Sequence, residues 1–301
     1  MTVQTERPLQ TALGYESTRP VAEATRLLRG PFLGRMEFKN VIFASDIHSS
    51  LSVTKEILDR FYGKADAIVF LGDYVDRGMQ GVEVLELLCS KMLEGERGGR
   101  TKIIMLRGNH ESEEMNKKYG FTREVGEKLG YGSYGVYGQF FSRLPFAAVV
   151  NNWFCVHGGL SMGIAKLDDI SLLPWPNVLS IYDRGVANQT AMQLVWNDPT
   201  EDPVYFGENP KRGTGVFTFG KTALTDFLSR NGLIGVIRGH ESPGGIKTQM
   251  DGRLVTVSTT WYVTGESVSV LEFDNGRMYE VELCKGGDMY EVELQLRKNP
   301  P

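Results

Sequence analysis

The segment that decides the fold is Gly72-Asp73-Tyr74-Val75-Asp76-Arg77-Gly78. It follows the apolar run 67–71, which predicts a buried β-strand, and it precedes residues 79–93, whose apolar side chains recur at helical spacing. Two carboxylates and a guanidinium group are therefore expected in a tight turn just beyond the carboxyl end of a strand. In open α/β sheets ligands bind at this edge. Asp-rich turns also occur simply as helix caps, so this turn alone leaves both interpretations open.

Length and composition indicate an ordinary globular protein. The 301 residues suffice for one large domain or two smaller ones, and 41% of them are hydrophobic and 23% charged. The net charge of −4 argues against a general nucleic-acid binder, and no apolar run approaches the ~20 residues of a membrane span. Three widely spaced cysteines and the absence of a signal-peptide pattern favour a reducing compartment. We expect a cytoplasmic protein that binds neither nucleic acid nor membranes; its oligomeric state is not predicted.

Four further predicted strands end in polar side chains that can bind metals. The strand at 41–44 leads to Asp46 and His48, that at 101–106 to Asn109 and His110, that at 153–156 to His157, and that at 233–237 to His240. All four histidines of the chain lie at such strand ends. Together with Asp73 they are expected to meet at one edge of the structure.

The chemistry of these side chains predicts a centre with two metal ions. Mixed imidazole and carboxylate ligands suit Mn, Fe, Zn or Co better than Ca, or Mg alone, and the absence of cysteine excludes a thiolate zinc site. The candidates are too many for one ion. Two ions that share a carboxylate can generate hydroxide at neutral pH and hold a phosphate for in-line displacement. Arg77, and Arg212 in the Gly-rich loop 207–215, offer guanidinium groups that match phosphate oxygens.

The order of these motifs resembles the phosphoprotein phosphatase (PPP) family of serine/threonine phosphatases, here as a divergent, prokaryotic-type member. The similarity extends over residues 40–275. It includes Asp46-x-His48, the segment 72–78, Gly108-Asn109-His110-Glu111, His157-Gly158-Gly159, Trp196-Asn197-Asp198-Pro199 and Arg238-Gly239-His240.

The resemblance implies a fold and a domain organisation. The expected fold is the α/β metallophosphatase (calcineurin-like) sandwich, in which two mixed β-sheets are flanked by helices. We expect residues 1–39 to form an N-terminal segment with a short helix and residues 40–275 to form the metallophosphatase catalytic domain. Residues 276–301 would form a C-terminal β-hairpin and tail that pack on the same domain.

The resemblance also implies the metal ligands. Asp46 and His48 would hold the first ion, Asp73 would bridge both ions, and the second ion would be completed by Asn109, His157 and His240. The expected cofactors are two divalent ions, with Mn²⁺ the first choice and Fe, Zn, Co or Ni the alternatives.

By the same resemblance, a hydroxide that bridges the two metal ions would attack phosphorus directly, without a phosphoenzyme. His110, oriented by Asp76, would be the general acid, and the phosphate would be bound by Arg77, Arg212, Asn109 and Tyr262. The implied substrate is a protein or peptide phosphorylated on serine or threonine, with phosphotyrosine as a secondary activity.

Three features of the sequence depart from the family pattern. Ser45 and Ser49 replace the glycines that usually flank the first motif, and they add side chains beside the first metal that can alter metal preference or access. The loop from Arg212 to Phe217-Thr218-Phe219-Gly220 is one residue longer than expected. Tyr262 keeps the aromatic side chain of a loop near the site, but the family's neighbouring cysteine is missing.

Two rival functions remain to be compared with this one. Residues 215–222 satisfy the P-loop pattern, but their central Val-Phe-Thr-Phe favours an extended chain over a phosphate cradle. Diadenosine tetraphosphate hydrolases and other metallophosphoesterases of the superfamily share the same signature motifs. Nucleases of that superfamily generally carry a second histidine soon after the last one, and none follows His240 here.

The C-terminal region contains a repeat. Residues 278–283, Met-Tyr-Glu-Val-Glu-Leu, recur as residues 289–294, and Asp274-Asn275-Gly276 just before them is a strong hairpin signal. Each copy alternates apolar and acidic side chains, as a strand with one buried face does. The repeat predicts a closing β-hairpin, or alternatively a duplicated edge strand that pairs with a partner.

Overall fold

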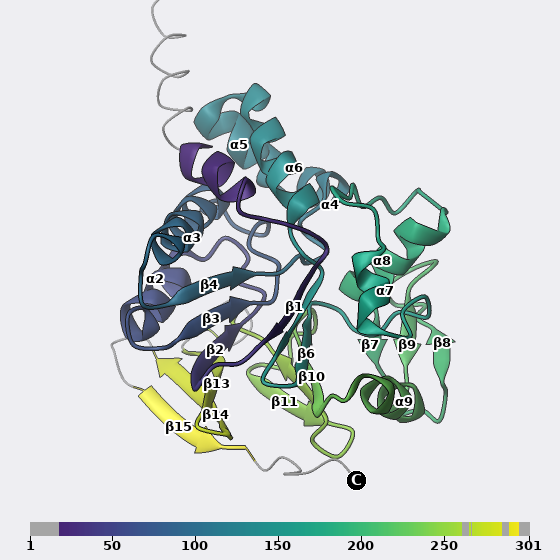
Figure 1. The fold of residues 1–301 in the computed structure, drawn as a ribbon. Coiled ribbons are helices and arrows are strands. Elements are labelled where there is room, and N and C mark those ends of the chain that lie inside the picture. The colour runs from purple at the N-terminus through teal and green to yellow at the C-terminus, as the bar shows by residue number, and fades with distance from the viewer. Residues whose placement is uncertain (1–17, 261–264, 266, 285–288, 295–301) are drawn as a thin grey trace, which may run out of the picture.

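The protein is described from a computed structural model, which covers residues 18–260, 265, 267–284 and 289–294. Two six-stranded mixed sheets pack face to face, and helices cover their outer sides (Figure 1). The predicted α/β sandwich is confirmed. Within this part of the chain no helix is both long and apolar enough to cross a membrane.

The first sheet has the strand order β15-β14-β13-β2-β3-β4. Its parallel part is β2 (Asn40–Ala44), β3 (Ala67–Phe70) and β4 (Lys102–Met105), and its antiparallel part is β13 (Ser267–Asp274), β14 (Arg277–Cys284) and β15 (Met289–Glu293). The central runs of this sheet are apolar throughout because both of their faces are buried. One face packs against α2 (Leu51–Phe61) and α3 (Gly81–Glu96), and the other packs against the second sheet.

The second sheet has the order β1-β5-β6-β10-β12-β11. Its strands are β1 (Phe32–Met36), β5 (Ala147–Val150), β6 (Trp153–Val156), β10 (Gly235–Arg238), β12 (Leu254–Val257) and β11 (Ile246–Gln249). Its outer face packs against α8 (Val186–Trp196), α9 (Lys221–Asn231) and the short α7 (Leu167–Ser171). Strand β1, which the sequence did not predict, pairs in parallel with β5 and ties the N-terminal segment to this sheet.

Two connections differ from the sequence prediction. Residues 160–200, expected to be irregular except near 191–196, contain α7 and a longer helix α8. A small third sheet of β7 (Asp198–Pro199), β9 (Phe217–Phe219) and β8 (Phe206–Glu208) was not predicted, because such short strands carry too little periodicity. Residues 217–219 form the extended strand β9, whereas a P-loop needs a turn there that wraps around a phosphate. The P-loop hypothesis is therefore wrong.

Helices α4 (Glu113–Tyr119), α5 (Phe121–Leu129) and α6 (Tyr134–Arg143) form the polar helical region expected between β4 and β5, with the 3₁₀ turn η1 (Tyr131–Ser133) before α6. Gly120, at φ 116°, separates α4 from α5. Farther upstream, residues 18–25 form a helix, close to the short helix expected there.

The predicted hairpins are confirmed. Asn151-Asn152 joins the antiparallel pair β5–β6, and Asn275-Gly276 joins β13–β14; all four residues have positive φ, as tight two-residue turns require. The two copies of the repeat form β14 and β15, which pair antiparallel. Strand β15 lies at the edge of the sheet with Tyr290 and Val292 exposed. Pairing of this edge with a partner stays a prediction.

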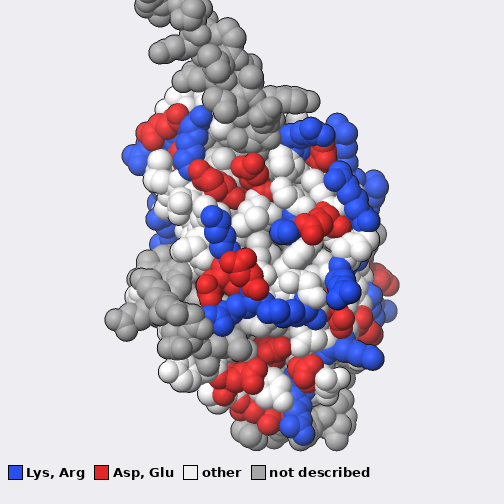
Figure 2. Space-filling view, turned by 90° about the vertical axis from the view of Figure 1, so that its left-hand side faces the viewer, with Lys and Arg blue, Asp and Glu red and all other residues white. Residues whose placement is uncertain are grey.

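The surface charges are mixed rather than segregated on the side of the molecule seen in Figure 2. There, basic and acidic side chains alternate over short distances, and neither sign forms a broad field. A polyanion such as DNA is bound through an extended basic surface, and this side of the protein does not offer one.

Candidate metal centre

The carboxyl ends of five strands from both sheets meet at one place. Strand β2 is followed by Asp46 and His48, β3 by Asp73, β4 by Asn109 and His110, β6 by His157, and β10 by His240. All of these side chains are buried. The two sheets therefore contribute to one cluster, and the structure brings together the residues that the sequence placed at separate strand ends.

The backbone at these strand ends is strained. Seven non-glycine residues have φ between 45° and 70°, in the left-handed region that such residues rarely adopt: Asp46, His48, Ser49, Asp73, Asp76, Arg77 and His240. Hydrogen bonds between turns hold this conformation, such as His48 N to Asp73 O at 3.0 Å. Strain of this kind is typical of functional sites, where the surrounding structure compensates for it.

Two glycines allow the turns after β3 and β4 to approach each other closely. A Cβ atom on Gly72 would come within 2.5 Å of the Gly108 nitrogen, and one on Gly108 would come within 2.2 Å of Asp73 Oδ1. Gly72 also has a φ of 114°, which favours glycine. Any side chain at either position would separate Asp73 from Asn109.

One group of potential metal-ligand atoms surrounds the side chain of Asn109. Its Oδ1 atom lies 3.0 Å from His157 Nε2 and 3.1 Å from His240 Nδ1, and His157 Nε2 lies 3.4 Å from Asp73 Oδ1. The other ring nitrogen of His157, Nδ1, hydrogen-bonds the Leu71 carbonyl, which leaves Nε2 with its lone pair. With the opposite amide orientation, Asn109 would donate to these atoms. A cation bound among them favours the orientation seen here.

A second group forms on the other side of Asp73. The distance from His48 Nε2 to Asp73 Oδ2 is 3.6 Å, and that from His110 Nε2 to the same oxygen is 4.0 Å. His48 Nδ1 hydrogen-bonds the Val75 carbonyl at 3.0 Å, so Nε2 is again the free nitrogen. Asp46 is buried nearby, and its Oδ2 accepts the backbone N–H of His240. Asp73 thus presents Oδ1 to one group and Oδ2 to the other.

The electrostatics of His48, His240 and Asp73 fit metal binding, whereas burial raises the pKa of Asp46, and Asp73 and Asp46 outweigh burial to raise the pKa of His157. Burial lowers the pKa of His48 to about 3 and holds the pKa of His240 well below its usual value, so both rings are neutral and can donate a lone pair. Burial raises the pKa of Asp73, but His157 and His110 outweigh burial and hold that pKa well below normal. Asp73 is therefore ionised, as a carboxylate that binds a metal ion must be.

His110 is held differently from the other histidines. Its Nδ1 lies 2.8 Å from Asp76 Oδ2, and Asp76 in turn accepts hydrogen bonds from Phe121 N and Asn116 Nδ2. Burial lowers the pKa of His110, but Asp73 and Asp76 outweigh burial, and the net shift is upward. His110 is therefore biased toward its protonated form, with Nε2 facing Asp73.

Two positioning residues were missed in the sequence. Asn116 donates to Asp76 and to the His110 carbonyl, and Tyr134 donates to Asn116 Oδ1 at 2.8 Å. Neither Asn116 nor Tyr134 lies at a strand end, and both depend on how α4 and α6 pack. No local pattern identifies them.

A third positioning residue, Glu111, lies inside a motif that the sequence analysis quoted without giving it a role. Its buried carboxylate accepts backbone N–H groups from Gly108, Asp73 and Tyr74, at 2.8, 2.9 and 2.9 Å. Burial and the charge of Asp73 raise the pKa of Glu111 to about 7. This one side chain joins the turn after β3 to the turn after β4.

Two of the expected phosphate ligands, Arg77 and Arg212, lie beside the cluster, and Asn109 lies within it. Arg77 is exposed, and its guanidinium group lies 5.1 Å from the centre of the Tyr119 ring. Arg212 is half-buried; its Nε lies 2.8 Å from Asp198 Oδ2, and its Nη2 donates to the His240 carbonyl. Tyr262 lies outside the described residues.

Asp198 was quoted in the sequence only as part of a linking motif. Asp198 also forms an ion pair with Arg238, at 2.9 Å. Burial raises the pKa of Asp198, but the positive charges of Arg238 and Arg212 outweigh burial and hold that pKa well below its usual value. Asp198 thereby anchors Arg212 beside His240.

Ser45 and Ser49 point into the packing between turns. Both are buried, and the Ser49 hydroxyl has no hydrogen-bond partner among the described atoms. A Cβ atom on Gly239 would lie 1.9 Å from Ser45 Oγ, and one on Gly81 would lie 2.9 Å from Ser49 Oγ. These hydroxyls therefore occupy space left by neighbouring glycines.

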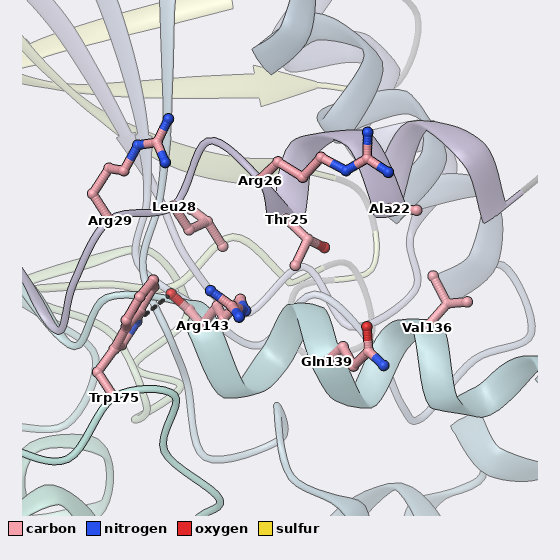
Figure 3. A pocket seen from close by; sticks show the side chains of 9 residues that line it. All are labelled: Ala22, Thr25, Arg26, Leu28, Arg29, Val136, Gln139, Arg143 and Trp175. Atoms are coloured by element: carbon pink, nitrogen blue, oxygen red, sulfur yellow. Dashed lines mark hydrogen bonds between the residues drawn. The ribbon is translucent and has the colours of Figure 1, made fainter.

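Two cavities differ in their relation to this cluster. A cavity of about 420 Å³ is lined by Tyr119, Trp196 and Arg212, and the rings of Tyr119 and Trp196 lie 4.9 and 5.4 Å from those of His110 and His240. A larger one, of about 510 Å³, lies between the N-terminal helix and α6 and contains none of the expected site residues (Figure 3). There Arg26 and Arg29 direct their guanidinium groups away from α6, so they form no converging anion site.

Comparison with known proteins identifies the family of the chain. Residues 39–243 match the family described as calcineurin-like phosphoesterases. The chain is 35% identical over 244 residues to the catalytic subunit of serine/threonine-protein phosphatase 4 of Saccharomyces cerevisiae, which covers 78% of this chain and 74% of the relative. It is 36% identical over 218 residues to serine/threonine-protein phosphatase T of Aspergillus oryzae, covering 70% of this chain and 43% of the relative.

Solved structures show the same fold. A Saccharomyces cerevisiae protein serine/threonine phosphatase superposes with a TM-score of 0.76 at 23% identity, over 95% of this chain and 91% of that one. A cold-active protein tyrosine phosphatase gives a TM-score of 0.67 at 18% identity, over 92% and 84%. The chain belongs to the calcineurin-like phosphoesterases and, within them, to the phosphoprotein phosphatase family.

Proposed function

We propose that the protein is a metal-dependent protein serine/threonine phosphatase that hydrolyses phosphomonoesters. The observation that carries this proposal is the position of Asp73, whose two carboxylate oxygens face two separate groups of ligand atoms, at 3.4 Å from His157 and 3.6 Å from His48. Relatives that are 35% and 36% identical to this chain are named serine/threonine phosphatases, which supports the choice of substrate.

The residues present fit two divalent ions. Asp46, His48 and Asp73 would hold one, and Asp73, Asn109, His157 and His240 the other. When bound, such a pair supplies a nucleophile from water at neutral pH and neutralises charge on the phosphoryl group. We propose Mn²⁺ as the preferred ion because the ligands are oxygen and imidazole nitrogen without a thiolate; Fe, Zn, Co and Ni are the alternatives to test.

Two arginines and an amide would bind the phosphate. Arg212 is held in place by Asp198 beside the His240 carbonyl, and Arg77 packs on the Tyr119 ring. Guanidinium groups fixed in this way can form paired hydrogen bonds with phosphate oxygens at a low cost in side-chain entropy. Asn109 and Tyr262 are proposed as further phosphate contacts.

His110 would deliver the proton to the leaving alcohol. Asp76 holds the proton on Nδ1, at 2.8 Å, so Nε2 is the atom that faces the cluster and can donate its own proton. The upward shift in the pKa of His110 favours the protonated ring that a general acid needs.

A direct competition tests the substrate class. Under one Mn²⁺ condition, kcat/KM is measured for a phosphoserine or phosphothreonine peptide, a phosphotyrosine peptide, diadenosine tetraphosphate and a phosphodiester. We expect the phosphoserine or phosphothreonine peptide to have the highest value and phosphotyrosine a lower one. If the dinucleotide or the diester is preferred by ~100-fold, the protein is a different metallophosphoesterase, with the metal ligands unchanged.

A further inference from the structure

The cavity of about 420 Å³ beside the metal centre has a composition of its own. Residues of α4, α8 and two loops line it: Met115, Lys118, Tyr119, Ile181, Tyr182, Arg184, Gln189, Met192, Trp196 and 211–216. We call this surface the basic groove. It begins at the reacting centre, because Tyr119 and Trp196 contact the rings of His110 and His240.

The charge of the basic groove is the opposite of that of the whole chain. Among the described residues that line it, four are cationic and none is a carboxylate, although the net charge of the protein is −4. Arg212 is paired with Asp198. Lys118, Arg184 and Lys211 are exposed and form no ion pair with any described residue; Lys118 only lies over the Tyr119 ring, at 5.0 Å. Unpaired cations gathered in a groove attract anions.

The shape and the apolar part of the groove indicate what kind of anion would bind. The side chains of Met115, Ile181 and Met192 contribute apolar surface between the cations, so the groove can hold a peptide backbone and aliphatic stems as well as charged ends. Three cations on three separate segments, α4, the loop before α8 and the loop before β9, can each meet a different side chain of one extended peptide.

We propose that the basic groove selects phosphoproteins with anionic side chains next to the phosphorylated residue, and that Lys118, Arg184 and Lys211 contact them. The anion can be a carboxylate or a second phosphate group, since both offer the oxygens that ammonium and guanidinium groups bind. This inference rests on the proposed function as a protein phosphatase. It adds a substrate preference that the metal centre alone does not provide.

The test compares phosphothreonine peptides that differ only beside the phosphate. One series carries glutamates on the N-terminal side, another carries them on the C-terminal side, a third carries a second phosphoserine, and glutamine and lysine peptides are the references. A wild-type kcat/KM about 10-fold higher for at least one anionic series than for glutamine, and lower again for lysine, is expected, since each exposed charge contact contributes roughly 2–5-fold. This preference should shrink in high salt.

The decisive variant reverses the three charges: Lys118→Glu, Arg184→Glu and Lys211→Glu together. The matched control, Lys64→Glu, Arg100→Glu and Lys247→Glu, changes the net charge equally at exposed positions that line neither cavity described above. The groove variant should lose or invert the preference and keep its turnover of an aryl phosphate, whereas the control should behave as wild type. If the triple variant does not fold, the single changes to Gln replace it, each expected to remove part of the preference.

The outcomes separate the two proposals. Equal kcat/KM for all phosphopeptides, or a preference that survives in the groove variant, overturns the inference and leaves the protein phosphatase in place. Turnover of the aryl phosphate without turnover of any phosphopeptide overturns the proposed function, and the inference with it.

Discussion

The floor and the rim of the proposed active site are built in opposite ways. The floor consists of buried strand-end residues such as Asp73, His110 and His157, each fixed by hydrogen bonds to backbone or to carboxylates. The rim consists of exposed cations such as Lys118 and Arg184 on a helix surface and a loop. A rigid floor suits chemistry common to all substrates, whereas long, exposed side chains at a rim suit graded recognition. Substitutions in the floor should therefore lower the turnover of every substrate by a similar factor, whereas substitutions in the rim should change the preference between substrates.

The largest effect is expected at the residue that both metal groups share. Asp73→Asn removes the charge that faces His48 and His157, so metal binding should weaken at both positions. Turnover of peptide and aryl phosphates should fall together, by about 10³-fold or more, since metal ions supply several kcal/mol of charge stabilisation. Metal content is measured by elemental analysis alongside kcat.

The control for Asp73→Asn is Asp59→Asn, at an exposed position of α2. A variant of Asp73 that retains two equivalents of metal would contradict its role as the bridging ligand.

The next effect should separate proton transfer from metal binding. His110→Asn should leave the metal content unchanged and lower kcat by about 10²–10⁴-fold for alkyl phosphates, the range typical of a general acid. The loss should be smaller for an aryl phosphate, because its leaving group needs less protonation. An empty metal position in this variant would mean that His110, which lies 4.0 Å from Asp73 Oδ2, is a ligand instead.

A smaller effect is expected at Glu111, which joins the turn after β3 to the turn after β4. The two carboxylate oxygens of Glu111 together accept hydrogen bonds from the N–H groups of Gly108, Asp73 and Tyr74. Glu111→Gln replaces one of these oxygens with an NH₂ group. At least one buried N–H then loses its partner, and the free energy of unfolding should fall by about 1–3 kcal/mol. Chemical denaturation measures it, with the exposed Glu113→Gln as the control. Equal stability of the two variants would show that Glu111 does not join these turns.

The difference between floor and rim also explains what the sequence could reveal. Asp73 and Asn109 each come soon after an apolar strand, so the sequence alone predicted that they lie at the same edge of the sheet. Lys118 and Arg184 are 66 residues apart, in the short helix α4 and an irregular loop, and only tertiary packing makes them line one groove. Asn116, which orients Asp76, was missed for the same reason.

The smallest effect concerns the departure from the family pattern at Ser49. The sequence predicted that this side chain could alter metal preference or access, but its Oγ lies against Gly81 at the start of α3 and is buried. We therefore expect Ser49→Gly to leave the Mn²⁺ affinity and kcat within about 3-fold of wild type, a shift well under 1 kcal/mol. Because Ser49 has a φ of 60°, glycine relieves strain that alanine keeps. Ser49→Gly should be more stable than Ser49→Ala by about 1 kcal/mol in thermal unfolding. A change in metal preference with unchanged stability would instead make Ser49 part of the floor, and the hydroxyl would then act on the first metal position.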